Sequence, residues 1–261
     1  MSVSHLTAVA CLEPGSDMNN NRKTLFSVPV DVYQPKEFIS MIEKALKTPG
    51  VKMLFAINPE KIMRAQKDPR LLSALQESNF LIPDGIGTVI GLKLSYGEGA
   101  LRTTGIGLMQ SLLKLAAEKK FKIFIFGAKP ASNRLAAENI LKQYPSLKLV
   151  GTQHGYIPAE KQEALIKKIN SSGADILFVG LGSPKQEKWI SQHKKDLKVK
   201  LCMGVGGSLD VLAGLIPAAP LWLQYLGIEW LYRLIREPSR FKRQLVLPKY
   251  VFLILRKKYL S

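Results

Sequence analysis

The stretch KIFIFGAKPASNRLAAENILKQ, residues 122–143, decides the fold class of this chain. Residues 122–126 are rich in Ile and Phe and have the length and composition of a buried strand, which Gly127 ends. Pro130 then stands at the first turn of segment 131–143, whose apolar residues recur at helical spacing. A strand, a glycine turn and a helix in this order form the repeating unit of a parallel α/β sheet.

The same alternation recurs along the rest of the chain. Further strands are predicted at Lys52–Ile57, Asn79–Ile82, Lys148–Val150, Asp175–Val179 and Val199–Met203. Further helices are predicted at Gly107–Lys119, Ala159–Ser171, Lys185–His193 and Ser208–Ala213, with Pro184 suited to a first turn. We therefore expect an α/β fold of Rossmann-like type, in which a largely parallel sheet carries helices on both faces.

Changes in composition divide the chain into three parts. Residues 1–24 lack the basic start and sustained apolar run of a secretory signal, and we expect them to be a flexible leader. Residues 25–218 contain the strand and helix alternation and form the α/β domain. Residues 219–261 mix leucines, aromatic residues and arginines at helical spacing, which predicts a helical appendage divided at Pro238 and Pro248.

Composition excludes several classes of protein. Of the 261 residues, 46% are hydrophobic and 22% are charged, and no short unit repeats, so the chain is folded rather than disordered or coiled-coil. The most apolar stretch, 215–235, contains Glu229 and Arg233, so we expect no membrane-spanning helix. Cys11 and Cys202 lie far apart, and the apolar surroundings of Cys202 favour a buried, reduced thiol and hence the cytosol.

The net charge of +18 indicates an anionic partner: a nucleic acid, a phosphorylated substrate or a negatively charged membrane surface. Nine basic and only two acidic residues lie between 219 and 261. Steps of three, four and three residues, typical of one helix face, separate Arg233, Arg236, Arg240 and Arg243. Such a face is either exposed to solvent or binds nucleic acid. Alternatively, its guanidinium groups close over a diphosphate and bind its oxygens through paired hydrogen bonds.

In an open α/β sheet, ligands bind beyond the carboxyl ends of the strands. The residues that follow the predicted strands there are Asn58, Asp84, Gly127, Gly182 and Gly206. The three glycines lie in turns that enter helices (GAKP, GLGSPKQE and GVGGSLD), where backbone N–H groups and the positive helix end favour phosphate. A nucleotide-type ligand is therefore expected.

Each candidate also has a purely structural interpretation. Asp84, in IPDGIG, either forms a turn or a helix cap, or acts as a general base whose carboxylate reaches within about 3 Å of a hydroxyl. Lys185 and Gln186 begin either an ordinary surface helix or a ligand-binding one. The segment 204–210 is either a close strand–helix contact or a ligand turn, and its glycines do not match the GxGxxG pattern of nicotinamide dehydrogenases.

No metal site and no cofactor are predicted. The residues His5, His154 and His193 show no ligand spacing, and the chain lacks the Asp-x-Asp triplet that holds a divalent ion against a nucleotide diphosphate. If a diphosphate leaves without a metal, arginines must supply the positive charge. The arginines of the basic segment 233–243 are candidates for this role.

Taken in order, eight motifs resemble the WecG/TagA/CpsF glycosyltransferase family, glycosyltransferase family 26. They are INPEKIM (57–63), IPDGIG (82–87), LRTTG (101–105), FIFGAKP (124–130), GTQHGY (151–156), GLGSPKQE (180–187), GVGGSLD (204–210) and EWLYRLIREPSRFKRQ (229–244). The resemblance runs from about Val28 to Lys249. It implies an inverting, metal-independent transfer of a sugar, typically of the N-acetylmannosamine type, in bacterial cell-surface polysaccharide synthesis. The donor is then a UDP-sugar and the acceptor a sugar on undecaprenyl diphosphate or a similar polyprenyl diphosphate, at the cytoplasmic face of the inner membrane.

The resemblance also implies roles for single residues. Asp84 matches the family's catalytic base. The arginines that act on the departing diphosphate correspond to Arg233, Arg240 and Arg243. The expected substrate-binding set is Asn58, Arg102, Gln186 and Asp210, together with Gly127 in the glycine turn and Lys185 at the helix start. Asp210 is expected to accept a hydrogen bond from the uracil N3–H, and the appendage to complete the active site and contact an anionic membrane surface.

One departure leaves the sugars open. Ala56 stands where some family members have Thr, so the transferred sugar is N-acetylmannosamine, its uronic acid or a neutral hexose. A basic nucleic-acid-binding protein is an alternative that rests on the net charge alone, without a recognised binding signature. A nucleotide-sugar-binding subunit without turnover is another. The transferase interpretation predicts no nucleic-acid partner.

Overall fold

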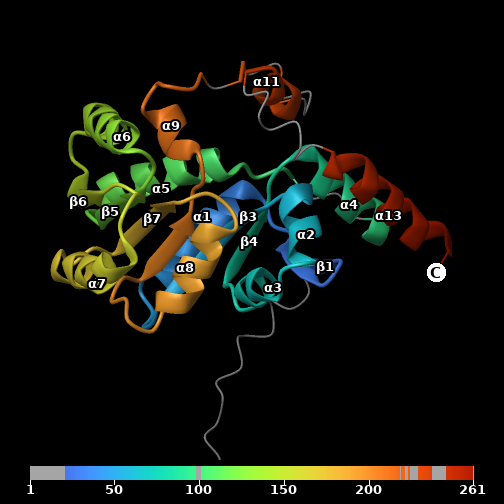
Figure 1. Cartoon of the computed structure of the whole chain (residues 1–261), viewed down its shortest axis with the longest axis horizontal. Coiled ribbons are helices and arrows are strands. Elements are labelled where there is room, and N and C mark those ends of the chain that lie inside the picture. Colours follow the sequence, from blue (N-terminus) through green and yellow to red (C-terminus); the bar gives the residue numbers. More distant parts are fainter. Residues whose placement is uncertain are drawn as a thin grey trace, which may run out of the picture.

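The computed structural model of the chain describes residues 21–97, 101–217, 219–220, 223, 229–236 and 245–260. Its centre is a six-stranded sheet in which neighbouring strands run parallel. In chain order the strands are β3 (Lys52–Ile57), β4 (Phe80–Pro83), β5 (Lys122–Gly127), β6 (Lys148–Gln153), β7 (Ile176–Gly180) and β8 (Leu201–Gly204). Across the sheet they follow the order β4-β3-β8-β7-β5-β6 (Figure 1). The parallel α/β fold expected from the sequence is confirmed.

Helices cover both faces of this sheet (Figure 1). Successive strand residues point to opposite faces: Met53 and Phe55 join one apolar cluster and Leu54 joins the other. The first cluster is covered by α2 (Pro59–Ala65), α3 (Pro69–Gln76), α7 (Gln162–Ser171, after the 3-10 turn Ala159–Lys161) and α8 (Lys185–His193). The second cluster is covered by α1 (Pro35–Ala45), α5 (Gly105–Lys119), α6 (Pro130–Gln143) and α9 (Ser208–Leu212).

A short antiparallel hairpin, β1 (Arg22–Leu25) and β2 (Val28–Asp31), precedes the sheet and was not predicted. It begins within the segment expected to be a leader, so that segment's boundary at residue 24 is wrong, and residues 1–20 lie outside the described residues. Arg22 donates to both carboxylate oxygens of Asp31, at 2.6 and 3.0 Å. Asp31 in turn accepts the backbone N–H of Leu81 at 2.7 Å. The hairpin is thereby fixed to β4, the strand that leads to Asp84.

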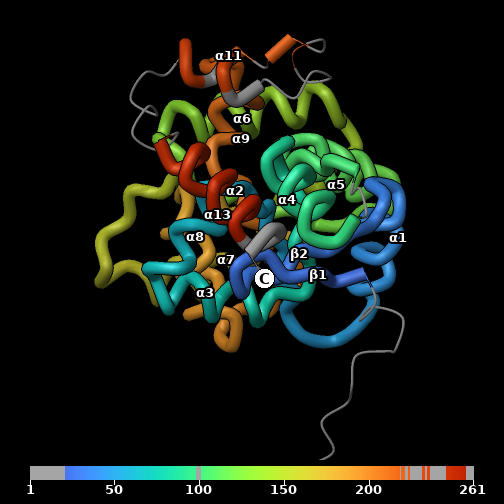
Figure 2. The backbone as a smooth tube through the Cα atoms, turned by 90° about the vertical axis from the view of Figure 1, so that its right-hand side faces the viewer, coloured from blue at the N-terminus to red at the C-terminus, as the bar shows by residue number. Residues whose placement is uncertain are grey.

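The carboxyl-terminal part of the chain contains α11 (Glu229–Arg236) and α13 (Val246–Leu260). Helix α13 packs against α4 (Ile86–Tyr96) and α2, beside the β1–β2 hairpin (Figure 2). Tyr250 and Ile254, four residues apart on α13, are each 2% exposed and belong to the first apolar cluster. The end of the expected appendage therefore packs on the α/β domain.

Pro248, one of the two prolines expected to divide the appendage, occupies the first turn of α13. A proline there removes no helical hydrogen bond. Pro238 lies outside the described residues. Of the helices that the structure describes, none combines the length and the apolar character needed to cross a membrane.

Cys202 is buried in β8 and is a free thiol, as predicted. Burial raises the pKa of this thiol, because the apolar surroundings disfavour the charged thiolate. The side chain therefore acts as a small apolar core residue. Cys11 lies outside the described residues.

Candidate active site

Asn58 and Asp84 are brought side by side by the register of two strands. In the β3–β4 pair, Ile57 lies opposite Pro83, so the next residue of each strand emerges at the same level of the sheet edge. The Asp84 backbone N–H donates to the Ile57 carbonyl at 2.8 Å. The Thr88 hydroxyl donates to the Ile57 carbonyl at 3.0 Å and to the Asp84 carbonyl at 3.2 Å. The backbone under both predicted site residues is thereby fixed.

The Asp84 carboxylate lies beside the first turn of α5. A Cβ added to Gly105, the first residue of α5, would stand 3.6 Å from Asp84 Oδ2 and 3.3 Å from the Ala56 methyl group. The N-terminal end of a helix stabilises negative charge, and a general base accepts a proton through its ionised carboxylate. Ala56, the departure from the family pattern, thus lies within the same small space.

Arg102 belongs to the loop before α5, which passes the end of β4. The N–H of the following residue, Thr103, donates to the Pro83 carbonyl at 3.0 Å, which places this loop against the end of β4. Thr104 then caps α5, its hydroxyl accepting the Gly107 N–H at 3.1 Å. The RTTG element therefore both starts α5 and lies next to Asp84.

Asn58 has a structural role in addition to the predicted one. It is the N-cap of α2, and its side-chain oxygen accepts the Lys61 N–H at 2.8 Å. A contact between Asn58 and a substrate can involve its amide nitrogen or the second lone pair of its oxygen, because the cap uses only one lone pair.

Gln186, on α8, is only 3% exposed and connects the ends of two strands. Its side-chain oxygen accepts the Gly206 N–H at 2.9 Å, in the turn after β8, and its nitrogen donates to Glu187 at 3.0 Å. Glu187 is fully buried and pairs with Lys61 of α2 at 2.6 Å. Neither Lys61 nor Glu187 was predicted as part of the site.

The remaining predicted residues lie around this core. Gly127 ends β5, and a Cβ at this position would overlap the backbone of Gly180 on β7, so the close contact of the two strands itself requires glycine. Lys185 is exposed at the start of α8. Asp210 is half-buried on α9, four residues beyond Gly206.

The predicted arginines are only partly described by the structure. Arg233 belongs to α11, while Arg240 and Arg243 lie outside the described residues. Within the described residues, no group of three or more His, Cys, Asp or Glu side chains is arranged to hold a metal ion.

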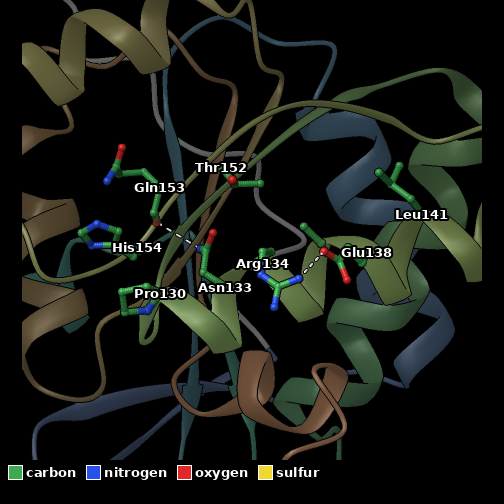
Figure 3. A pocket seen from close by; sticks show the side chains of 9 residues that line it. Pro130, Asn133, Arg134, Glu138, Leu141, Thr152, Gln153 and His154 are labelled. Atoms are coloured by element: carbon green, nitrogen blue, oxygen red, sulfur yellow. Dashed lines mark hydrogen bonds and ion pairs between the residues drawn. The ribbon is translucent and has the colours of Figure 1, made fainter.

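An open pocket of about 390 Å³ lies at the opposite edge of the sheet (Figure 3). It is formed by α6 and the end of β6, including Asn133, Arg134, Glu138 and His154. Arg134 already pairs with Glu138 at 2.8 Å, and Asn133 donates to the carbonyls of Gly127 and Gln153. Because β4 and β6 are the two edge strands, this pocket is far from Asp84.

Two comparisons with known proteins agree. The model of the glycosyl transferase WecG/TagA/CpsF family matches residues 23–261. The N-acetylglucosaminyldiphosphoundecaprenol N-acetyl-beta-D-mannosaminyltransferase of Bacillus subtilis (strain 168) is 34% identical over 237 residues, which cover 90% of this chain and 92% of the relative. The family match thus includes the whole six-stranded sheet and both α11 and α13.

Proposed function

This chain belongs to the WecG/TagA/CpsF glycosyl transferase family, and from that premise we propose that it transfers an N-acetylmannosamine-type sugar from a UDP-sugar to an acceptor sugar on undecaprenyl diphosphate. The observation that carries the proposal is the position of Asp84. Its carboxylate follows β4 at the carboxyl edge of a parallel sheet and lies beside the start of α5. The relative's name supports the acceptor and the transferred sugar.

In the proposed reaction, the Asp84 carboxylate accepts the proton of an acceptor hydroxyl. The hydroxyl oxygen then forms a bond to the anomeric carbon of the donor sugar. The bond between that carbon and the diphosphate oxygen breaks, and UDP leaves with the electron pair. Attack from the side opposite UDP inverts the anomeric configuration.

The proposed substrate-binding residues belong to segments that follow strands at the carboxyl edge of the sheet. Asn58 follows β3 and Arg102 precedes α5, while Gln186, Lys185 and Asp210 belong to helices that follow β7 and β8. Gly127 is proposed to let the donor approach the backbone at the end of β5. Asp210 is proposed to accept the uracil N3–H.

The departing diphosphate requires positive charge, which we assign to Arg233, Arg240 and Arg243 rather than to a metal ion. Guanidinium groups bind phosphate oxygens through paired hydrogen bonds and carry a permanent charge. Transfer that persists in the presence of EDTA supports this assignment. Transfer that stops with EDTA and returns with a divalent ion contradicts it.

We also propose that residues 219–261 form a separate functional unit that places the enzyme on an anionic membrane surface, at the cytoplasmic face where its lipid-linked acceptor lies. Large apolar side chains are exposed on the described part of this unit: Ile235 is 70%, Phe252 63% and Leu245 59% exposed. Together with the nine basic residues of the segment, they suit an interfacial surface. Sedimentation with anionic liposomes, and its loss in Phe252→Ser, tests this placement.

The function is tested by incubating the protein with a panel of UDP-sugars and a short-chain polyprenyl-diphosphate-linked N-acetylglucosamine. UDP release and product mass are followed for the unmodified chain, Asp84→Asn and the control Asp196→Asn, whose side chain is 63% exposed. We expect acceptor-dependent UDP release that falls by about 10²–10⁴-fold in Asp84→Asn only. Release with a uronic acid or hexose donor instead would change the transferred sugar, and salt-sensitive DNA binding without turnover would contradict the function.

A further inference from the structure

A buried ion pair lies beneath the candidate active site. Lys61 Nζ is 2.6 Å from Glu187 Oε1, and the two side chains are 6% and 0% exposed. Both ions lose their hydration here, so such a pair contributes little stability relative to two apolar side chains of similar size. Stability alone therefore does not explain why charged residues occupy these positions.

The ion pair is the centre of a continuous hydrogen-bonded chain from β3 to the turn after β8. Lys61 Nζ also donates to the Ala56 carbonyl at 2.6 Å, and the Lys61 backbone N–H donates to the side-chain oxygen of Asn58. On the other side, Glu187 Oε1 accepts from Gln186 Nε2, and Gln186 Oε1 accepts from the Gly206 N–H. One lysine thus connects Asn58 with Gln186, two residues proposed to bind substrate.

The partners of Gln186 fix the orientation of its amide. A carboxylate can only accept a hydrogen bond, and a backbone N–H can only donate one. The amide nitrogen must therefore face Glu187 and the amide oxygen must face Gly206. Lys61 keeps this arrangement in place, because its ammonium group pairs with Glu187 Oε1, the same oxygen that accepts from Gln186.

We propose that Lys61 and Glu187 are positioning residues, which hold Gln186 and through it the Gly206 turn in the arrangement that binds the donor nucleotide. This inference rests on the proposed function. Neither residue touches the substrate. Their effect reaches the donor only through Gln186, and this restriction makes the proposal testable.

The test is a double-mutant cycle on the full chain. The KM for the UDP-sugar, kcat, and the Kd of UDP by calorimetry are measured for the unmodified chain, Glu187→Gln, Gln186→Ala and the double variant. We expect Glu187→Gln to raise the KM and the UDP Kd by about tenfold, the scale of one hydrogen bond to a charged group, with a smaller change in kcat. In the Gln186→Ala background, Glu187→Gln should cause no further change.

A matched control is available on the same helix. Lys188 pairs with Asp68 of α3 at 2.6 Å, one residue beyond Glu187 but away from Gln186. Lys188→Met should leave the KM and the UDP Kd unchanged. If Glu187→Gln does not fold, the double variant Lys61→Met with Glu187→Leu replaces the ion pair by an apolar contact. This variant lacks the hydrogen bond to Gln186 and should show the same loss of donor affinity.

The outcomes separate the two proposals. The positioning role is overturned if Glu187→Gln has the same effect with and without Gln186, or if the KM is unchanged in folded variants. Sugar transfer by the unmodified chain would still uphold the proposed function in that case. If the unmodified chain neither transfers sugar nor binds UDP, the proposed function fails and this inference fails with it.

Discussion

The hydroxyl of Tyr250 on α13 lies directly against Gly91 on α4, so closely that a Cβ on residue 91 would overlap the oxygen. Tyr250 is 2% exposed, and its ring also meets Phe26 edge to face at 6.1 Å between centroids. The hydroxyl has no hydrogen-bond partner among the described residues, and burial raises the pKa of the group. This contact fixes the last helix to the rest of the chain.

Gly91→Ala should therefore displace α13. Alanine favours a helix interior by about 1 kcal/mol over glycine, but overpacking costs about 1–3 kcal/mol, so the net effect is destabilising. We expect a lower melting temperature and faster amide exchange in residues 246–260. Tyr250→Phe removes the overlapping oxygen, so the double variant should recover most of the loss. A Gly91→Ala protein with unchanged exchange would show that α13 does not depend on this contact.

Gly127→Ala should destabilise the chain more than Gly182→Ala does. Both glycines have positive φ, +127° and +75°, and so share a backbone cost, but only at Gly127 would a Cβ meet another strand. The additional overlap with Gly180 should add about 1–3 kcal/mol to the loss in the free energy of unfolding. Urea denaturation of both variants measures the difference. Equal losses would mean that conformation alone, and not the close approach of β5 and β7, requires the glycine.

Two carboxylates that tie α3 to α8 should make the fold sensitive to acid. A hydrogen bond from Lys188 lowers the pKa of Asp68, and hydrogen bonds from Ser73 and Lys194 lower the pKa of Glu77. Because these pKa values are depressed in the folded chain, their stabilisation is present above the unfolded values of 3.8 and 4.5 and is lost as the pH falls through the folded ones.

Urea denaturation at pH 6, 5, 4 and 3 should therefore show less acid destabilisation in Asp68→Asn with Glu77→Gln than in the unmodified chain. Solvent screens both pairs, so each should contribute about 1 kcal/mol or less. The two curves should approach each other as the pH falls. Parallel curves over the whole range would assign the acid sensitivity to other groups.

Arg240→Ala should slow sugar transfer without unfolding the chain. Removing one positive group that stabilises a developing charge costs roughly 10²–10⁴-fold in rate, so kcat should fall by about this factor. Arg240→Lys keeps the charge and should retain more of the rate. A loss confined to liposome binding, with full transfer to a water-soluble acceptor, would instead assign Arg240 to the membrane surface.

The six strands of the central sheet and helices α5, α6, α7, α8 and α9 could be predicted because local patterns determine them, whereas the β1–β2 hairpin and helices α1 to α4 were not predicted. β3 and α8 have the predicted bounds, since an apolar run and a proline-initiated helix are complete signals in themselves. Helix α4 is apolar around most of its surface and is covered by α13. Its sequence therefore lacks the alternation of one apolar and one polar face that marks an amphipathic helix. The packing of α13 on α4 joins residues about 160 positions apart, such as Tyr250 and Gly91, so no local sequence pattern predicts it.

Only part of the candidate site could be predicted from the sequence. Asn58 and Asp84 follow from the rule that ligands bind where parallel strands end, and the structure places them together. The pairing of Lys61 with Glu187 does not follow from any such rule. A lysine and a glutamate normally indicate a solvated surface, and only the packing of α2 and α8 on the same face of the sheet buries these two.

That strand order also has a consequence for how the protein is made. β8 pairs with β3 on one side and with β7 on the other, although it follows all of them in the sequence. During synthesis, the segment carrying Asn58 and Asp84 and the segment carrying β5, β6 and β7 must wait for residues 201–204 before one sheet can join them. Until β8 is made, the edges of β3 and β7 that it pairs with are unpaired, and unpaired strand edges favour aggregation.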